Sequence, residues 1–321
     1  GDALLPTGVT HGAASIADFD EDGTRDVVVT GQDETGTPTA ELYIGDGDGN
    51  FFPGDALIPT GVTNSSTSVG DFDNDEHLDL LVTGEDDTGT PTATVYFGDG
   101  TGQFPGDALL PTGVTNGASD VADLNGDGNV DLFVTGRDAE GTPTTTVYFG
   151  DGAGTFVPGD IGGSFSPVRN SSVNVADVNA DGAPDVLLTG RDATGTATTQ
   201  LLMGDGAGSF FSGSAGLEGV ASGSANIADL TGDGPPDIFL TGETNSGTFT
   251  TSLYENLGDD APNQTPIATA DTFITEAGQT LRLAPPGVLA NDTDPNGDPL
   301  TASRISGVSN GTLALNADGS F

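Results

Sequence analysis

The sequence predicts an all-β protein, a β-propeller of four-stranded blades followed by a partial β-sandwich. An acidic nonapeptide of the form D-x-[D/N/T]-x-D-x-x-x-D occurs five times, and its copies begin at residues 18, 71, 123, 177 and 229. No segment carries apolar residues at helical spacing over three turns, whereas 51 glycines favour short strands joined by tight turns. A repeat of about fifty residues that holds four antiparallel strands is typical of one propeller blade.

Each repeat follows the same order of predicted elements. A short strand leads into the acidic loop, and a nearly continuous apolar strand follows it. A polar connection then separates this strand from a third one, whose β-branched and aromatic residues suit a pleated sheet. A G-D-G-x-G-x-F hairpin turn precedes the fourth strand, and its phenylalanine is expected to pack between blades. In the second copy the four predicted strands are residues 67–70, 78–83, 92–97 and 103–109.

The two ends of the repeat region are out of phase. Residues 1–10 repeat the segment 106–115, which supplies a fourth strand and the link to the next repeat. The fifth repeat, in contrast, ends after its third strand at 250–254. A spare outer strand at one end and a missing one at the other fit a closed ring of five blades. They fit a fragment of a larger ring equally well, so the sequence leaves both open.

A change in composition divides the chain. We expect the propeller at 1–257 and a proline-bearing linker at 258–266. Beyond the linker, residues 267–321 alternate short strand-like segments with turn residues, as in the first part of an immunoglobulin-like sandwich. This part is too short for a whole sandwich, which takes about 100 residues. The strands expected in it are 272–275, 280–283 and 311–315.

The nonapeptide has the ligand pattern of a hard-cation site. Side-chain oxygens at positions 1, 3, 5 and 9, with a backbone carbonyl at position 7, approach the roughly six to eight oxygen ligands that Ca²⁺ takes. Mg²⁺ is the second choice because it requires a stricter octahedron, and zinc is disfavoured because nitrogen and sulfur ligands are missing. The predicted ligands are Asp18, Asp20, Asp22, Thr24 and Asp26 in loop one; Asp71, Asp73, Asp75, His77 and Asp79 in loop two; Asp123, Asn125, Asp127, Asn129 and Asp131 in loop three; Asp177, Asn179, Asp181, Ala183 and Asp185 in loop four; and Asp229, Thr231, Asp233, Pro235 and Asp237 in loop five.

These loops are not EF-hands, because Val29 and Leu188 stand at position 12 of loops one and four, where an EF-hand has glutamate. The alternative is a set of solvated acidic turns. Carboxylates that share a loop without a cation repel one another by roughly 1 kcal/mol per pair at 4 Å in water. This repulsion favours a bound cation. Loop five is the weakest candidate, because Thr231 replaces an acid or amide, and whether it binds metal stays open.

The charge of the chain restricts its partners. It has 49 acidic residues, six arginines, no lysine and a formal net charge of -43. Such a field repels nucleic acid and anionic lipid, and it attracts cations. No apolar run is long enough for insertion into a membrane. The absence of cysteine excludes disulfides and thiolate metal sites. Without an initiator methionine or signal peptide, the chain is expected to be a monomeric segment of a larger protein.

No catalytic constellation is evident in the sequence. The two histidines, His11 and His77, lie far apart, and no Ser/His/Asp set is recognisable. The polar connections at 31–38, 84–91, 136–143 and 190–197 could vary to bind a ligand, although solvated hairpin loops are commoner.

In the order of their motifs, the repeats resemble the FG-GAP/VCBS-type blades of integrin α-like propellers. Each nonapeptide is followed by an apolar strand and then by V-Y-F-G-D-G-x-G-x-F or a variant of it. The Phe-Gly pair is kept at Phe97 and Phe149, whereas Ile44 and Met203 replace the phenylalanine in other copies. The resemblance covers residues 1–257 and implies an extracellular propeller that binds calcium through the loop residues given above.

The rest of the chain resembles the cadherin-like or Ig-like modules of large bacterial surface proteins, chiefly through residues 287–300 and 311–321. Together, the two resemblances imply a non-enzymatic module for adhesion or ligand binding in a secreted or surface protein. Calcium would stabilise its blades, and its partner would be an extracellular protein or a glycan. A polysaccharide-acting propeller enzyme and a purely structural spacer remain alternatives.

Overall fold

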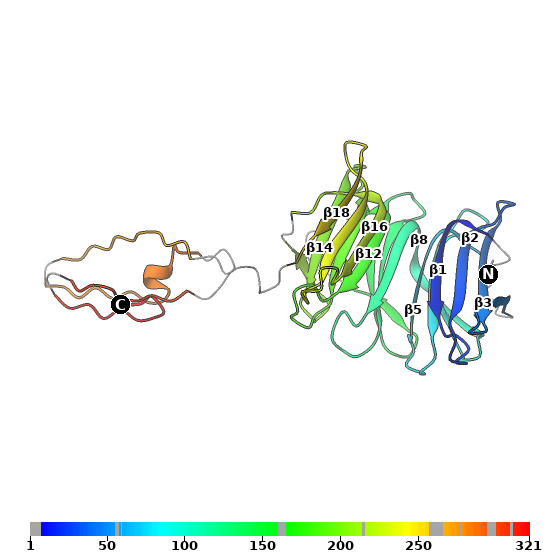
Figure 1. Ribbon diagram of the computed structural model, residues 1–321, viewed down its shortest axis with the longest axis horizontal. Helices are drawn as coiled ribbons and strands as arrows, with labels where there is room; N and C mark the ends of the chain where they lie inside the picture. The colour runs from blue at the N-terminus through cyan, green and yellow to red at the C-terminus, as the bar shows by residue number, and fades with distance from the viewer. Residues whose placement is uncertain are drawn as a thin grey trace. The chain divides into compact units, whose positions relative to one another are not determined.

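The computed structural model describes residues 8–54, 58, 60–159, 165–213, 216–256, 266–276, 278–293, 300–308 and 311–321. The chain divides into two compact units, Gly1–Asn256 and Leu257–Phe321. All strands lie in the first unit, every pair of them is antiparallel, and the described residues contain no α-helix (Figure 1). The prediction of an all-β protein is confirmed. In the described part of the chain, no helix is long and apolar enough to cross a membrane.

The strands of the first unit form four hydrogen-bonded sheets, and the seven-stranded one holds repeats two and three. Counted by repeat they make five groups, which we number as sheets one to five. Sheet one consists of β1 (Thr10–Ala17), β2 (Asp26–Gln32), β3 (Pro38–Gly45) and β4 (Phe51–Pro53). Sheet two consists of β5 (Thr63–Gly70), β6 (Asp79–Glu85), β7 (Pro91–Phe97) and the first half of β8 (Gly106–Ala122). Sheet three consists of the second half of β8, β9 (Asp131–Arg137), β10 (Pro143–Gly150) and β11 (Phe156–Pro158). Sheet four consists of β12 (Arg169–Ala176), β13 (Asp185–Arg191), β14 (Ala197–Gly204) and β15 (Phe210–Ser212), and sheet five of β16 (Ala221–Ala228), β17 (Asp237–Glu243) and β18 (Phe249–Tyr254).

Strand β8 belongs to two sheets. Its first half pairs with β7 and its second half pairs with β9, so that sheets two and three are continuous in hydrogen bonding. The outer strand of one repeat thus becomes the inner strand of the next. The segment expected to complete sheet five is 1–10; its residues 1–7 lie outside the described residues, and Thr10 begins β1.

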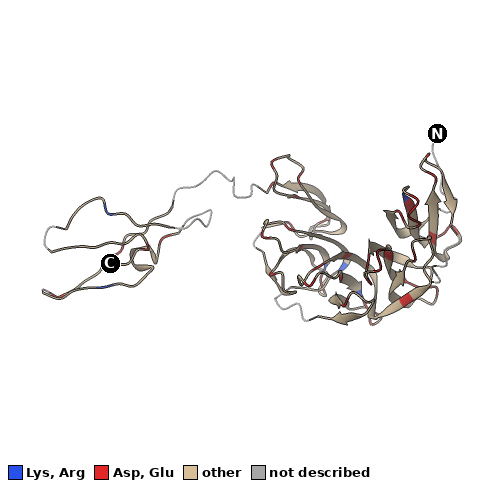
Figure 2. Cartoon of the chain, turned by 90° about the horizontal axis from the view of Figure 1, so that it is seen from below, with Lys and Arg blue, Asp and Glu red and all other residues tan. Residues whose placement is uncertain are grey.

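The inner strands β1, β5, β8, β12 and β16 lie side by side in chain order. Polar side chains connect them: Ser15 and Thr67 share a hydroxyl hydrogen bond of 2.7 Å, and Asp120 Oδ2 accepts the Val175 N–H at 2.7 Å. In Figure 2 the sheets follow an arc that is open between sheet one and sheet five. The described strands therefore form an arc, and a closed ring stays a prediction.

The hydrophobic core lies between neighbouring sheets. It consists of four clusters, and each cluster takes its residues from two successive sheets and the loops beside them. Three pairs of phenylalanine rings cross these junctions edge to face: Phe19 with Phe104 at 5.8 Å, Phe72 with Phe156 at 6.1 Å, and Phe133 with Phe210 at 6.5 Å. The second member of each pair is the phenylalanine of a G-D-G-x-G-x-F turn. The prediction that this residue packs between sheets is confirmed at these three junctions.

The second unit departs from the sequence prediction. Its described residues contain one 3₁₀ helix, η2 (Gly287–Leu289), and the strands predicted at 272–275, 280–283 and 311–315 are wrong. Isolated backbone bonds hold this unit, such as the pair exchanged by Leu283 and Phe321 at 2.8 and 3.3 Å. Ile274 and Ile305 are 88% and 99% exposed, so no described residues cover these two side chains. Residues 258–265 of the predicted linker lie outside the described residues.

Candidate metal centre

Each acidic loop connects the first and second strands of its sheet, and its ninth residue begins the second strand. In loop two, Asp79 Oδ2 accepts the Phe72 N–H at 2.6 Å, and its Oδ1 accepts the Gly98 N–H at 2.8 Å. The aspartates at this position are all fully buried. Each accepts a backbone N–H from its own loop, two in the case of Asp237, and one from the end of the third strand or just beyond it. The other four are Asp26, Asp131, Asp185 and Asp237.

Burial acts against the charge of these aspartates. It raises the pKa of Asp79 to about 7 and that of Asp131 to about 6, although the backbone N–H donors oppose the shift. Burial also raises the pKa of Asp185. In loop five, the hydrogen bond from the Asn256 N–H lowers the pKa of Asp237 instead. A cation close to Asp79 or Asp131 would favour the ionised carboxylate, because an opposite charge stabilises it.

Loops one and two each gather three carboxylates. One oxygen from each of Asp18, Asp20 and Asp22 lies within 4.8 Å of the others, and Asp71, Asp73 and Asp79 form the same kind of group. Among the described residues these are the groups of three acidic or histidine side chains close enough to hold one ion. Burial is the main reason why the pKa values of Asp20 and Asp73 are raised, and neighbouring carboxylates add to it.

Two oxygens of these groups, Asp18 Oδ1 and Asp73 Oδ1, are buried and have no hydrogen-bond partner. Buried polar atoms are normally satisfied, and leaving one unsatisfied costs about 1–3 kcal/mol or more when the group is charged. A cation would satisfy both oxygens. Because all the candidate side-chain ligands in these two loops are oxygens, the donor set fits a hard cation such as Ca²⁺.

Loops three, four and five differ at position three. Asn125 Oδ1 accepts the Asp127 N–H at 2.9 Å, and Asn179 Oδ1 accepts the Asp181 N–H at 3.0 Å. In loop five, the Thr231 hydroxyl donates to Asp233 Oδ1 at 2.8 Å. In these three loops the side chain at position three also donates to the carboxylate at position five, whereas Asp20 of loop one only accepts the N–H of Asp22.

In every loop the residue at position six has a positive φ and donates its backbone N–H to the first aspartate. The N–H of Gly23 donates to Asp18 Oδ2 at 3.0 Å, and that of Gly128 donates to Asp123 Oδ2 at 2.9 Å. Both glycines adopt φ 89°, which side chains other than hydrogen disfavour. Loop two places Glu76 there at φ 72°, and its N–H makes the same bond to Asp71 at 3.0 Å. The loop geometry is thus kept even where the sequence lacks glycine.

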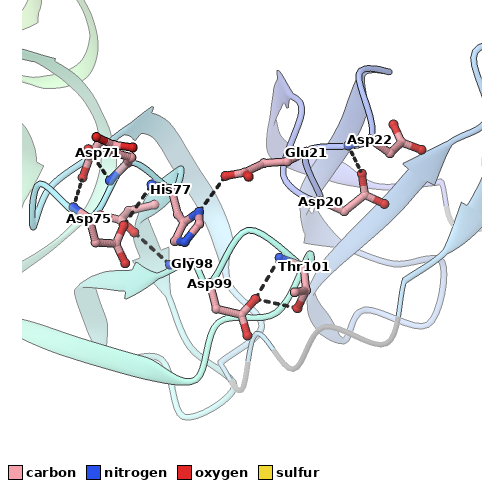
Figure 3. Close-up of polar contacts among 11 residues, drawn as sticks. Asp20, Glu21, Asp22, Asp71, Asp75, His77, Gly98, Asp99 and Thr101 are labelled. Carbon is pink, nitrogen blue, oxygen red and sulfur yellow. Dashed lines mark hydrogen bonds and ion pairs between the residues drawn. The ribbon is translucent and has the colours of Figure 1, made fainter.

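In loops two and three the side chain at position seven contacts a neighbouring loop, whereas the Thr24 hydroxyl of loop one donates to Asp22 Oδ1 of its own loop at 2.6 Å. His77 Nδ1 lies 2.6 Å from Glu21 Oε1 of loop one, and this contact raises the pKa of His77 (Figure 3). In the same way, Asn129 Oδ1 of loop three accepts from Asn74 Nδ2 of loop two at 2.9 Å. The ligand predicted from position seven is the backbone carbonyl, which these side-chain contacts do not involve. The sequence gave no signal for these contacts, which join residues 55 and 56 positions apart.

The G-D-G-x-G-x-F turn of one sheet also packs on the acidic loop of the preceding sheet. The Gly102 N–H donates to Phe19 O at 3.0 Å, and the Gly208 N–H donates to Leu124 O at 3.1 Å. Within the first of these turns, Asp99 Oδ1 accepts from the N–H and the hydroxyl of Thr101 (Figure 3). The acidic loops therefore lie where two sheets meet, and a bound ion there would stabilise the junction as well as the loop.

The polar connections considered as ligand loops are closed by their own side chains. In the second of them, Asp86 Oδ1 accepts the N–H groups of Thr88 and Thr90 at 2.9 Å, and these bonds with the Thr88 hydroxyl lower its pKa. This carboxylate is therefore occupied in holding the turn.

Sequence profiles of known families match both parts of the chain. The profile of the FG-GAP-like repeat matches residues 18–82, 77–134, 123–188 and 177–240, and that of the bacterial Ig domain matches residues 263–321. Among curated proteins, none matches this chain significantly.

Several solved structures are similar to the chain at low identity. The V. cholerae biofilm matrix protein Bap1 is 15% identical with a TM-score of 0.42, and the match covers 77% of this chain but 38% of Bap1. YjhT is 12% identical with a TM-score of 0.47, over 79% of this chain and 82% of YjhT. The Aleuria aurantia lectin, solved in complex with α-methyl-L-fucoside, is 14% identical with a TM-score of 0.43, over 78% of this chain and 77% of the lectin.

Proposed function

The chain belongs to the FG-GAP-like repeat family and carries a bacterial Ig domain, and from this premise we propose that it is a calcium-binding module for extracellular adhesion or ligand binding. In this proposal, residues 1–257 form a β-propeller whose blades are the five sheets. Residues 258–266 are a linker, and 267–321 are the Ig-like part. The module is non-enzymatic, belongs to a secreted or surface protein, and presents its loops to an extracellular protein or glycan.

The observation that carries the calcium site is the pair of unpartnered oxygens, Asp18 Oδ1 and Asp73 Oδ1. Each lies in a loop with three converging carboxylates. Three carboxylates in one loop without a counter-ion repel one another, and a buried oxygen without a donor adds to this cost. A divalent cation with many oxygen ligands removes both unfavourable terms. Ca²⁺ is favoured over Mg²⁺ because a flexible loop with carboxylate, amide and carbonyl oxygens does not impose a strict octahedron.

Calcium bound in this way would act on stability. For a loop with a Kd of about 10⁻⁴ M in about 10 mM calcium, linkage gives roughly 2.7 kcal/mol if only the folded loop binds. A few such loops would equal the whole stability of an ordinary domain, about 5–15 kcal/mol. Because loops one to four contact the next sheet, we expect the ions to hold successive sheets together and so to shape the ligand-binding surface.

Calorimetric titration of the full chain with calcium after chelation, combined with thermal unfolding, tests the site. We expect close to five sites and a large rise in melting temperature. Asp20→Asn should weaken one site, because it removes one of the three charges in loop one. A matched control is Asp48→Asn, since Asp48 lies exposed in a hairpin turn of the same sheet. Melting that calcium leaves unchanged, or equal losses in the two variants, would refute the proposal.

The ligand-binding part needs a separate test. Arrays of glycans and of extracellular proteins, probed with the calcium-loaded chain, should give specific binding that chelation weakens. Blank arrays together with a normal calcium response would indicate a structural spacer. New reducing or unsaturated ends in polysaccharides incubated with the chain would show an enzyme instead.

A further inference from the structure

Half of the arginines of this chain gather where sheets three and four adjoin. Arg137 ends β9, Arg169 begins β12 and Arg191 ends β13. Arg169 and Arg191 are directly paired in register. The Thr135 hydroxyl donates to Val168 O at 3.0 Å, which fixes the start of β12 beside the end of β9. We call these three residues the arginine cluster.

The direct pairing of Arg169 with Arg191 is electrostatically unfavourable by itself. Residues that are directly opposite in an antiparallel pair project from the same face, and like charges at such positions destabilise the sheet. The corresponding pair is uncharged or has a single charge in the other four sheets: Thr10 with Gln32, Thr63 with Glu85, Thr115 with Arg137, and Ala221 with Glu243. Sheet four alone places an arginine opposite another arginine.

Carboxylate partners for this cluster are few, although acidic side chains are found over most of the chain (Figure 2). Arg191 pairs with Glu243 Oε2 at 2.8 Å and donates to Gly195 O at 3.0 Å. The guanidinium of Arg169 donates only to Asn170 Oδ1, at 3.4 Å, among the described residues. No hydrogen bond or ion pair joins Arg137 to any described side chain.

The nearest acids in the sequence are turned to other partners. Asp138 Oδ1 accepts the N–H groups of Glu140 and Thr142, and Asp192 Oδ1 accepts those of Thr194 and Thr196. All three arginines are half-buried. A guanidinium partly removed from water without an anion is unfavourable, so an external anion would stabilise the cluster.

From this geometry we propose that the arginine cluster binds the carboxylate of a uronic acid unit in an acidic glycan. The proposal rests on the ligand-binding function proposed above and specifies the class of ligand. The planar guanidinium fork matches a carboxylate through two parallel hydrogen bonds. Neutral residues follow Arg169 in β12: Asn170 accepts from its guanidinium, and the buried hydroxyl of Ser171 has no hydrogen-bond partner. Such groups suit the hydroxyls of a sugar ring.

The net charge favours a uronate over an acidic protein or a densely sulfated chain. A formal charge of -43 repels any partner that brings an extended negative surface. A uronic acid polymer carries one carboxylate per ring, surrounded by neutral hydroxyls. The carboxylate of one ring can reach the half-buried guanidinium groups, and the neutral hydroxyls between successive carboxylates keep the charge density below that of a sulfated chain.

Titration calorimetry of the calcium-loaded full chain tests this inference, with tetragalacturonate as the probe. Its carboxyl-reduced form and a tetraglutamate peptide are the comparison ligands, all at the same free calcium. We expect tetragalacturonate to bind and the two comparison ligands to bind at least about tenfold more weakly. Equal or tighter binding of tetraglutamate would overturn the assignment to a glycan.

Arg169→Thr introduces threonine, the residue that sheets one, two and three have at the corresponding position of the inner strand. It should weaken tetragalacturonate binding about 10- to 100-fold, because charge-assisted hydrogen bonds are lost. It should not lower the melting temperature of the ligand-free chain, because the like-charge pair is removed. Arg282→Gln, in the second unit, is the matched control and should bind as the wild type does.

The outcomes separate this inference from the function on which it rests. Unchanged binding by Arg169→Thr, or no binding of tetragalacturonate while another glycan or protein binds, would overturn the arginine cluster and leave the ligand-binding function standing. Failure of every glycan and protein ligand would overturn the ligand-binding function itself. Lower thermal stability of ligand-free Arg169→Thr would show that Arg169 serves the fold.

Discussion

Replacing the ninth aspartate of an acidic loop should separate its structural contribution from its predicted role as a metal ligand. Asp131 in loop three is fully buried, and its two oxygens accept the N–H groups of Leu124 and Gly150, each at 2.9 Å. In Asp131→Ala both donors lose their acceptor. An unsatisfied buried donor costs about 1–3 kcal/mol, so the variant should be less stable by about 2–6 kcal/mol even in chelator.

Asp127→Ala is the comparison for this experiment. Asp127 is exposed and bonds only within loop three, to Asn125 and Asn129. Its removal should cost roughly 0.5–1.5 kcal/mol in chelator, and about 2.7 kcal/mol more in calcium if one site is lost. Asp131→Asn should be intermediate, because the amide keeps one acceptor oxygen and turns an NH₂ group toward the other donor.

Urea unfolding of the three variants, with and without calcium, measures these differences. Hydrogen exchange at the amides of Leu124 and Gly150 gives a local readout, because in a repeat architecture each unit mainly affects its neighbours. Burial raises the pKa of Asp131 to about 6, so the stability it contributes in chelator is full below the unfolded pKa near 3.8 and falls as pH rises through 6. The cost of Asp131→Ala should therefore be larger at pH 4 than at pH 8. An Asp131→Ala variant as stable as the wild type in chelator would refute the structural role.

Three further predictions follow from other contacts. Burial raises the pKa of Asp120, so its contribution to stability is full below the pKa of the unfolded chain and is lost as pH rises through the folded pKa. Asp120→Asn should therefore make the melting temperature in chelator depend less on pH between pH 4 and 8. A pH dependence equal to that of the wild type would contradict this. Glu21→Gln should lower the pKa of His77, measured by NMR titration of its ring, because the contact with Glu21 raises that pKa; an unmoved titration would rule the contact out. Phe104→Ala should cost about 3–5 kcal/mol in urea unfolding, because its ring packs on Phe19 between two sheets, whereas Phe52→Ala, at a side chain that is 55% exposed, should cost far less.

The repeats could be predicted from the sequence because their signals are local. Apolar strands, polar turns and acidic loops recur with a fixed order, so the strands of each sheet fall close to where the pattern places them. The FG-GAP resemblance, drawn from the same motifs, is confirmed. A fourth strand was predicted at 103–109 and is present as β8, which begins at Gly106 and continues to Ala122. The pattern cannot show that one strand serves two sheets, because this depends on pairing with β9.

Failures of prediction in the second unit have a physical cause. Segments such as 272–275 alternate correctly for a strand, but a strand forms only when a partner supplies its hydrogen bonds and a second layer covers its apolar face. The described residues give 272–275 no strand partner, and Ile274 stays exposed. The match to a bacterial Ig domain is found in the sequence alone.

Two local features of the sequence mark where the backbone approaches closely and where an acid is buried. A Thr-Gly pair ends every second strand, as at Thr83 and Gly84. Gly84 adopts φ 152°, and a Cβ added there would lie 2.8 Å from Thr63 O. Only glycine lets the inner strand approach so closely. The ninth aspartate is the first residue of an apolar strand. This position predicts that its carboxylate is buried.

The residues of an acidic loop serve two different purposes, one within a sheet and one between sheets. The ninth aspartate ties its loop to the third strand of the same sheet, and this bond requires no ion. Side-chain contacts between neighbouring loops, such as Glu21 with His77, join partly exposed groups and are weaker. An ion held by positions 1, 3 and 5 would therefore matter most for these partly exposed contacts between loops, which add little to the buried core between the sheets. If this is correct, chelation should loosen the contacts between sheets before it unfolds any single sheet.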